Sequence, residues 1–177
     1  MPHLLSFWEK EQWFSPVDVA IVGGGLLGLW TAYALQERQP HLRITLLERQ
    51  AVPLGASTRN AGFACFGSPS ELWHDAQQMG WDAVLEVVAM RYQGIQKLRA
   101  VLGDAAIGFE PCGGYECYTS MPPHFQQSLL ELNHRLQAVF QQPQAFSLAT
   151  HRMAHMGLQG FEGMVENSLE GSIHSGQ

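Results

Sequence analysis

Residues 23–28 have the residue types and the spacing of a phosphate-binding turn. They read Gly-Gly-Gly-Leu-Leu-Gly and match the pattern G-x-G-x-x-G. In such a turn Gly23 permits a tight bend, Gly25 lets a pyrophosphate approach the main chain, and Gly28 lets a helix pack closely on a sheet. The free N–H groups at the start of that helix then face the phosphates. The motif therefore predicts that the chain binds a dinucleotide.

Glu48 strengthens this prediction. It follows Gly28 by 20 residues, at the place where an acidic side chain accepts hydrogen bonds from the ribose hydroxyls of an adenosine. Its charge also repels a 2′-phosphate, which disfavours NADP. The alternative is a chance glycine-rich turn with a surface glutamate, and that alternative does not explain why the two features are in register.

A second stretch, residues 55–63, is rich in small and hydroxyl-bearing side chains and reads Gly-Ala-Ser-Thr-Arg-Asn-Ala-Gly-Phe. Its small residues would let the chain lie flat against a cofactor, and Ser57 and Thr58 would donate to phosphate oxygens. Composition alone favours another interpretation, a flexible polar loop.

The elements that must position these residues follow from the apolar pattern. Residues 17–22 are a compact apolar run and predict a buried strand, residues 26–38 predict a helix that ends before Pro40, and residues 42–48 predict a second strand. A helix that joins two strands in this way is a βαβ unit with parallel strands. The fold class is therefore α/β with a Rossmann-type binding domain.

The rest of the chain predicts a second, α+β region. A capping-box sequence begins at Ser68 and starts a helix that ends near Gly80, and apolar residues spaced by three or four predict a longer helix from Asp82 to Gly103. Further elements are expected as one or two strands within 107–120, a helix over 122–140, a short strand at 146–148, a helical turn near residue 152 and a weakly patterned tail over 157–177.

Composition and charge exclude several classes. Lys and Arg total 10 against 16 Asp and Glu, and no basic cluster exists, so binding to DNA or RNA is not expected. Residues 19–35 carry no charge, but they are too few to span a bilayer and contain the glycine turn, so no transmembrane segment is predicted. Three cysteines without a secretory signal predict free thiols in a reducing compartment, the cytoplasm.

Other chemistry-bearing residues give weaker signals. Cys112 and Cys117 fit strand positions better than a metal pair, and Cys65 is expected to be a small buried hydrophobic residue. His151 and His155 are four residues apart, but no third ligand is evident nearby, so no metal site is predicted. Glu110, Tyr115 and Tyr118 are candidates to line a substrate pocket.

The glycine motif, Glu48-Arg49 and residues 55–63 together resemble the N-terminal part of the FAD-dependent oxidoreductases of the D-amino acid oxidase class, which includes glycine, sarcosine and other amine or amino-acid oxidases. The resemblance is closest over residues 17–67. It implies FAD as cofactor, with the glycines at the pyrophosphate, Glu48 at the adenosine ribose and Arg49 by the adenine. It places residues 57–58 near the pyrophosphate and residues 59–63 beside the isoalloxazine ring. The implied cofactor-binding residues are Gly23, Gly25, Leu26, Leu27, Gly28, Glu48, Arg49, Ser57, Thr58, Arg59, Asn60, Ala61, Gly62 and Phe63.

The resemblance also implies a domain order. It gives the FAD-binding βαβ unit and flavin loop over 17–67, and an insertion of the substrate domain over 68–156. The polar and aromatic residues before them, 1–16, predict a short N-terminal arm that packs on the body. Residues 157–177 would return to the FAD domain. Enzymes of this class are much longer, so the chain is expected to be a fragment. Because an incomplete parallel sheet exposes an unpaired edge, the isolated chain is expected to fold poorly or aggregate, which a cooperative thermal transition would contradict.

The activity that the resemblance implies is oxidation of a small-molecule amine or amino acid. Hydride would pass from the substrate α-carbon to flavin N5, and dioxygen or another electron acceptor would reoxidise the flavin. No catalytic residue is assigned within this segment. Two alternatives remain open, a flavin dehydrogenase for a 2-hydroxy acid or glycerol phosphate, and a nucleotide-binding remnant without catalysis.

Overall fold

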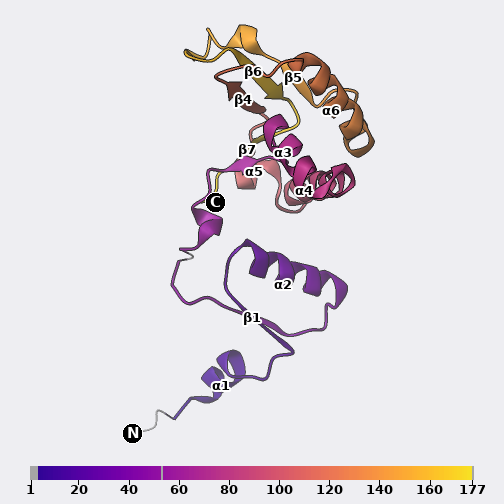
Figure 1. The fold of residues 1–177 in the computed structure, drawn as a ribbon. Helices are drawn as coiled ribbons and strands as arrows, with labels where there is room; N and C mark the ends of the chain where they lie inside the picture. Colours follow the sequence, from indigo (N-terminus) through magenta and orange to yellow (C-terminus); the bar gives the residue numbers. More distant parts are fainter. Residues whose placement is uncertain (1–3, 53, 177) are drawn as a thin grey trace. The chain divides into compact units, whose positions relative to one another are not determined.

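The structure is a computed structural model that describes residues 4–52 and 54–176. Three parts of the predictions therefore lie outside the described residues: residues 1–3 of the arm, Pro53 of the FAD-binding region, and Gln177 at the end of the tail. The chain forms two compact units, Met1–Asn60 and Ala61–Gln177, which are described one at a time (Figure 1). Among the described residues, no helix is both long and apolar enough to cross a bilayer.

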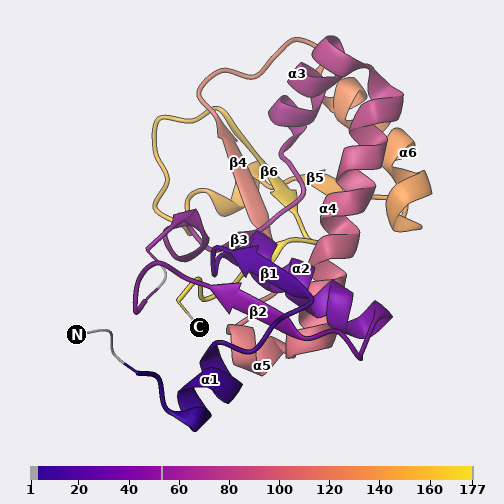
Figure 2. The ribbon, with the colours of Figure 1, turned by 90° about the horizontal axis from the view of Figure 1, so that it is seen from below.

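The first unit is the βαβ unit that the sequence predicts. Strand β1 (Val19–Val22), helix α2 (Leu26–Arg38) and strand β2 (Ile44–Leu47) follow one another along the chain. The two strands pair in parallel, with Val19 opposite Ile44 and Val22 opposite Leu47, and they lie side by side in Figure 2. The 3-10 helix η1 (Ala56–Thr58) completes the unit on the C-terminal side. The predictions of a parallel pair and a crossover helix are confirmed.

Local interactions fix both ends of this unit. The carboxylate of Asp18 accepts a hydrogen bond from the Arg43 N–H at 2.8 Å, which joins the starts of the two strands. Helix α2 begins after Gly25 and ends where the Gln39 N–H donates to the Leu35 carbonyl at 2.8 Å. Pro40 follows directly, and a proline cannot continue a helical hydrogen-bond ladder.

The N-terminal arm contains a helix that the sequence analysis did not predict. Helix α1 (Phe7–Trp13) starts at a capping box in which the Ser6 hydroxyl accepts from the Glu9 N–H, and the Glu9 carboxylate accepts from the Ser6 N–H. Phe7, Trp8 and Phe14 are 67%, 73% and 62% exposed. The expected packing of the arm on the body stays a prediction.

The second unit is an antiparallel sheet covered by helices. Strands β4 (Gly114–Tyr118), β6 (Gly163–Asn167) and β5 (Phe146–Leu148) form a sheet in the order β4-β6-β5. Strands β3 (Phe63–Ala64) and β7 (Gly171–Ser172) form a separate antiparallel pair. The remaining elements are α3 (Pro69–Met79), α4 (Trp81–Leu102), α5 (Asp104–Ile107), α6 (Phe125–Phe140) and the 3-10 helix η2 (Thr150–Arg152).

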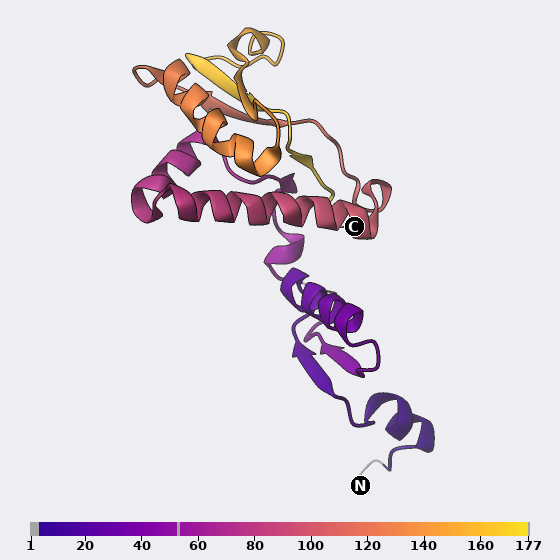
Figure 3. The ribbon, with the colours of Figure 1, turned by 90° about the vertical axis from the view of Figure 1, so that its right-hand side faces the viewer.

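A large core, with a smaller cluster of Ala149, Met153 and Met164 beside the sheet, holds this unit together. Figure 3 shows α4 along its length with α6 beside it, and both contribute side chains to the core. The fully buried members of the large core come from the loop before α3, from α3, α4 and α6, and from the sheet, and they include Phe66, Leu72, Val88, Leu132, Leu136, Phe146 and Val165. Burial of each such side chain stabilises the fold by about 1.5–3 kcal/mol relative to exposure.

The predicted helices of the second unit are confirmed. The prediction of one or two strands within 107–120 is also confirmed, because this stretch holds one regular strand, β4, after the short helix α5. The tail is not weakly patterned, because β6 is the central strand of the sheet. Four of its five residues are buried, so it lacks the alternation by which half-buried strands are predicted. The return of residues 157–177 to the FAD domain stays a prediction.

Candidate functional site

The glycine turn between β1 and α2 is built around a contact that only glycine allows. A Cβ placed on Gly28 would lie 2.0 Å from the carbonyl oxygen of Gly23, which is far inside van der Waals contact. Gly23 itself has a φ of +107°, a conformation that other residues rarely adopt. The Gly23 N–H donates to the Leu47 carbonyl at 2.8 Å and so joins the turn to β2. The turn is therefore rigid where the first turn of α2 begins.

Glu48 follows β2 and lies against this turn. Its carboxylate accepts hydrogen bonds from the Gly24 N–H at 2.8 Å and from the Gln50 N–H at 3.1 Å. The Gly24 hydrogen bond, and next the one from Gln50, lower the pKa of Glu48, so the side chain is charged at neutral pH. A carboxylate has about four lone-pair positions, which leaves it able to accept further hydrogen bonds from a ligand hydroxyl.

Ser57 of η1 lies at the N-terminus of α2. The Leu26 N–H, one of the unpaired donors of the first helical turn, donates to the Ser57 hydroxyl oxygen at 2.9 Å. A Cβ on Gly25 would lie 3.0 Å from the same oxygen. The absence of a side chain at residue 25 thus leaves room for Ser57 to approach the helix, and it brings a hydroxyl to the place where a helix binds anions.

These residues surround a cavity of about 540 Å³ within the first unit. Its volume lies in the range of small-molecule and cofactor sites. The glycine turn, the residues after β2 and the η1 segment form its walls, with Val22, Gly23, Gly25, Leu47, Glu48, Arg49, Gln50, Leu54, Gly55, Ala56 and Ser57 as lining residues. These groups fit the adenosine and diphosphate half of a dinucleotide. The Glu48 carboxylate can accept hydrogen bonds from a ribose, and the N-terminus of α2 can bind phosphates at the same cavity. Leu26 and Leu27 lie exposed in the first turn of α2.

The next three candidate residues form a polar turn after Ser57. The Asn60 amide donates to the Ser57 carbonyl at 2.8 Å, and the Thr58 hydroxyl donates to the Gly55 carbonyl at 3.4 Å. Thr58, Arg59 and Asn60 are all exposed. Their role at the cofactor stays a prediction.

The last three candidates, Ala61, Gly62 and Phe63, begin the second unit. Gly62 is buried, with a φ of +76°, and its carbonyl accepts a hydrogen bond from the Ile173 N–H at 2.7 Å. A Cβ on Gly62 would lie 2.3 Å from the Ile173 carbonyl oxygen. Phe63 is 75% exposed, so its ring is free to contact a ligand.

The β3–β7 pair opens onto a second cavity, of about 440 Å³, which lies wholly within the second unit. Three segments line it: β3 with the residues up to Glu71, residues 112–115, and residues 170–172. Tyr115, which the sequence suggested as a pocket residue, is among them, whereas Glu110 and Tyr118 are not. Cys65 is exposed and lines this cavity, so its expected burial is wrong. Desolvation, and next the charge of Glu170, raise the pKa of the Cys65 thiol.

Two carboxylates of the second unit were not found from the sequence. Glu170 is only 9% exposed and lines the second cavity. Glu116 accepts hydrogen bonds from the Ser68 hydroxyl at 3.1 Å, from the Ser70 N–H at 3.2 Å, and from the Tyr118 hydroxyl. Desolvation, and next the bond to Glu116, raise the pKa of Tyr118. The Gly113-Gly114 doublet is a local feature that fits this close packing, because a Cβ on Gly114 would lie 2.3 Å from Glu170 Oε2.

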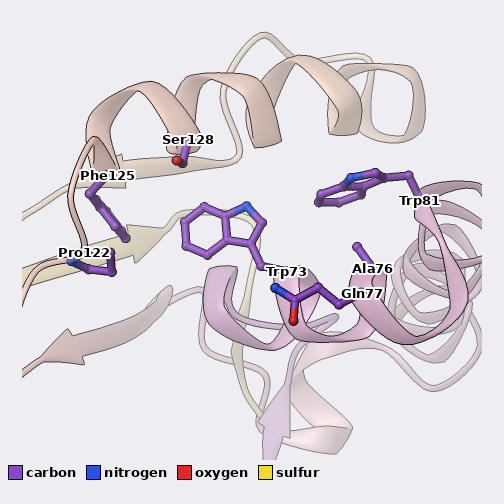
Figure 4. A pocket seen from close by; sticks show the side chains of 7 residues that line it. All are labelled: Trp73, Ala76, Gln77, Trp81, Pro122, Phe125 and Ser128. Atoms are coloured by element: carbon purple, nitrogen blue, oxygen red, sulfur yellow. The ribbon is translucent and has the colours of Figure 1, made fainter.

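A third cavity, of about 330 Å³, is shown in Figure 4. The rings of Trp73 and Trp81 lie on the side of α3 and α4, and Phe125 and Ser128 face them from α6. Trp73 packs edge-on against Phe125 with ring centroids 5.6 Å apart. None of the seven lining residues is ionisable, so this aromatic cavity offers no acid or base for catalysis. In the part of the chain that the structure describes, no group of three His, Cys, Asp or Glu side chains is placed to hold a metal.

Comparison with known proteins identifies the family. The model of the FAD dependent oxidoreductase family, DAO, matches residues 18–177, and the chain therefore belongs to this family. The prediction of the D-amino acid oxidase class is confirmed. None of the curated proteins with which the sequence was compared matches it.

Two solved structures share the fold. A glycine oxidase from Bacillus cereus ATCC 14579 has a TM-score of 0.54 and 22% sequence identity, over 91% of this chain and 42% of that one. A glycine oxidase from Geobacillus kaustophilus has a TM-score of 0.51 and 21% identity, over 90% of this chain and 41% of that one. The chain thus spans about two fifths of the length of these glycine oxidases.

Proposed function

We propose that this protein binds FAD and oxidises a small amine or amino acid by transfer of a hydride from the carbon that bears the nitrogen. The observation that carries the proposal is the arrangement of Glu48, Ser57 and the glycine turn around one cavity at the N-terminus of α2. The family of the chain and its fold likeness to two glycine oxidases support the choice of cofactor and of substrate class.

Bound FAD would supply the hydride acceptor. The residues of the first unit bind and orient its adenosine diphosphate half. Glu48 accepts hydrogen bonds from the ribose hydroxyls. Gly25, which has no side chain, lets the diphosphate approach the main chain. Ser57 and the first turn of α2 supply donors to the phosphate oxygens, a role that the helix dipole assists. Leu26, Leu27 and Gly28 form that first turn, while Arg49 lies at the adenine end and Thr58 beside the phosphates.

The segment from Arg59 to Phe63 is proposed to run beside the ring system. Amine oxidation by hydride transfer depends on orientation of an unprotonated amine more than on a dedicated base. The exposed Phe63 fits that task, because its ring can orient a ligand and does not titrate.

Titration of the purified protein with FAD, FMN and NAD tests cofactor choice, with tryptophan fluorescence or heat as the signal. FAD is expected to bind most tightly, because FMN lacks the adenosine that Glu48 would hold. The Glu48→Ala variant is expected to weaken FAD binding by about tenfold or more, the loss of a hydrogen bond to a charged group. Glu37→Ala is the matched control, since Glu37 is an exposed glutamate near the far end of α2. Absence of FAD binding by the wild-type protein would refute the proposal.

Substrate class is tested by mixing the flavin-loaded protein with candidates in the absence of oxygen. Small amines and amino acids are expected to bleach the visible flavin absorption. Bleaching by a 2-hydroxy acid or glycerol phosphate instead would support a related dehydrogenase. A flavin that binds and that none of these compounds bleaches would support a nucleotide-binding protein without this catalysis.

A further inference from the structure

Glu170 is a buried carboxylate at a junction of three segments in the second unit. It directly precedes β7, which pairs with β3. On the other side of β7, Ser172 exchanges two main-chain hydrogen bonds with Glu110, each of 3.0 Å. The Glu170 carbonyl accepts from the Gly113 N–H at 3.1 Å. Glu170 is therefore tied to both neighbouring segments of the second cavity.

The side chain of Glu170 holds the main chain that follows β3. Its Oε1 accepts a hydrogen bond from the Phe66 N–H at 2.8 Å, across 104 residues of sequence. The Phe66 carbonyl accepts from the Arg91 guanidinium at 3.2 Å, and that guanidinium pairs with Glu71 at 3.3 Å. The main-chain N–H and the main-chain carbonyl of Phe66 are thus each hydrogen-bonded to a charged side chain. The Phe66 ring is fully buried in the core.

The surrounding backbone leaves the space that this carboxylate occupies. A Cβ on Gly114 would lie 2.3 Å from Glu170 Oε2, and a Cβ on Gly171 would lie 2.4 Å from the Glu110 carbonyl oxygen. Burial, the largest influence, raises the pKa of Glu170, while the N–H groups of Phe66 and Gly67 oppose that shift. A carboxylate that is largely buried is costly to keep, which points to a task that an apolar residue would not perform.

We propose that Glu170 is a positioning residue for the flavin, because it fixes the main chain of residues 62–67 in one conformation. This inference rests on the function proposed above, in which residues 61–63 run beside the ring system. The start of the segment is fixed by the Gly62 carbonyl, which accepts from the Ile173 N–H, and its end is fixed by Glu170. Loss of the second anchor loosens the main chain at Phe66, three residues beyond Phe63, while the pairing of β3 with β7 remains.

Hydrogen exchange of the Phe66 amide, together with FAD affinity and the flavin absorption spectrum, tests this role. Glu170→Ala is expected to speed exchange of that amide by about tenfold or more, since it removes a bond to a charged acceptor. It is also expected to weaken FAD binding and shift the flavin absorption band. Glu170→Gln keeps an oxygen acceptor for the Phe66 N–H, so it is expected to restore slow exchange, affinity and spectrum. Glu110→Gln makes the same chemical change on an exposed neighbour and serves as the control.

The outcomes separate this inference from the proposed function. Wild-type protein that binds no FAD would overturn the proposed function and, with it, the role of Glu170 toward the flavin. Wild-type protein that binds FAD, with a Glu170→Ala variant of equal affinity and spectrum, would overturn the inference alone. If Glu170→Ala does not fold, Glu170→Gln decides, and a Gln variant with fast Phe66 exchange or weak FAD binding would overturn the inference.

Discussion

Gly28 in the first turn of α2 lies against the carbonyl of Gly23, with 2.0 Å between that oxygen and the place of a Cβ on residue 28. The clash involves main chain on both sides, so a rotamer change cannot relieve it. The glycine of this motif is therefore required by packing between the helix and the turn, independently of any ligand.

Gly28→Ala is accordingly expected to destabilise the protein by about 1–3 kcal/mol, as overpacked sites do, and to abolish FAD binding. Urea unfolding followed by circular dichroism and FAD titration measure the two effects. Gly94→Ala is the control, because Gly94 lies inside α4 and a Cβ added there would meet no atom within 4 Å. That change is expected to stabilise by about 0.5–1 kcal/mol. Equal stability of Gly28→Ala and the wild-type protein would contradict the packing of this turn.

The hydroxyl of Ser57 caps α2 from a distant segment. Ser57→Ala removes the acceptor of the Leu26 N–H and is expected to cost about 0.5–2 kcal/mol, like the loss of an N-cap, and to weaken FAD binding. Thr31→Ala removes another hydroxyl on α2, which donates to the Leu27 carbonyl within the helix, and is expected to leave both quantities nearly unchanged. Thermal unfolding and FAD titration of the two variants provide the comparison. If Thr31→Ala lowers stability or FAD affinity more than Ser57→Ala does, Ser57 is not the residue that caps α2.

The sequence predicted those parts of the molecule whose causes are local. The β1–α2–β2 unit follows from short apolar runs on either side of the glycine turn, and the α3 start follows from Pro69 and from Glu71, whose carboxylate accepts the Ser68 N–H. The carboxylates of the second unit were missed because their partners are distant in sequence. Glu170 bonds to Phe66 across 104 residues, and Glu116 bonds to Ser70 across 46. Neither partnership leaves a periodic pattern.

Asn133 joins α6 to β5 in the same long-range manner. Its Oδ1 accepts from the N–H groups of Ala145 and Phe146, each at 2.9 Å, and its Nδ2 donates to the Phe146 carbonyl at 2.8 Å. Asn133→Ala removes the acceptor of these two buried N–H groups, while the Phe146 carbonyl keeps the Gln144 amide as a donor at 3.2 Å. The substitution is expected to cost about 3 kcal/mol. His134→Ala, an exposed neighbour, is expected to change stability by less than about 0.5 kcal/mol. Chemical denaturation measures both, and a small cost at residue 133 would argue against this connection.

The buried carboxylate of Glu170 also predicts how stability depends on pH. Because its pKa is raised above 4.5 in the folded protein, the folded state binds a proton more readily than the unfolded state. The group therefore contributes stability that is fully present below pH 4.5 and is lost as the pH rises through the raised folded value. Glu170→Gln cannot titrate at residue 170, while Glu48 and Glu166, whose causes of pKa shift do not include Glu170, are present in both proteins and largely cancel in the difference. The melting temperature of the wild-type protein minus that of Glu170→Gln is thus expected to increase as the pH falls from 7 toward 4.5. Melting curves of the two proteins across this range measure it, with Glu110→Gln expected to show no such trend. A difference that is constant, or that decreases on acidification, would mean that Glu170 is not held in a desolvated site.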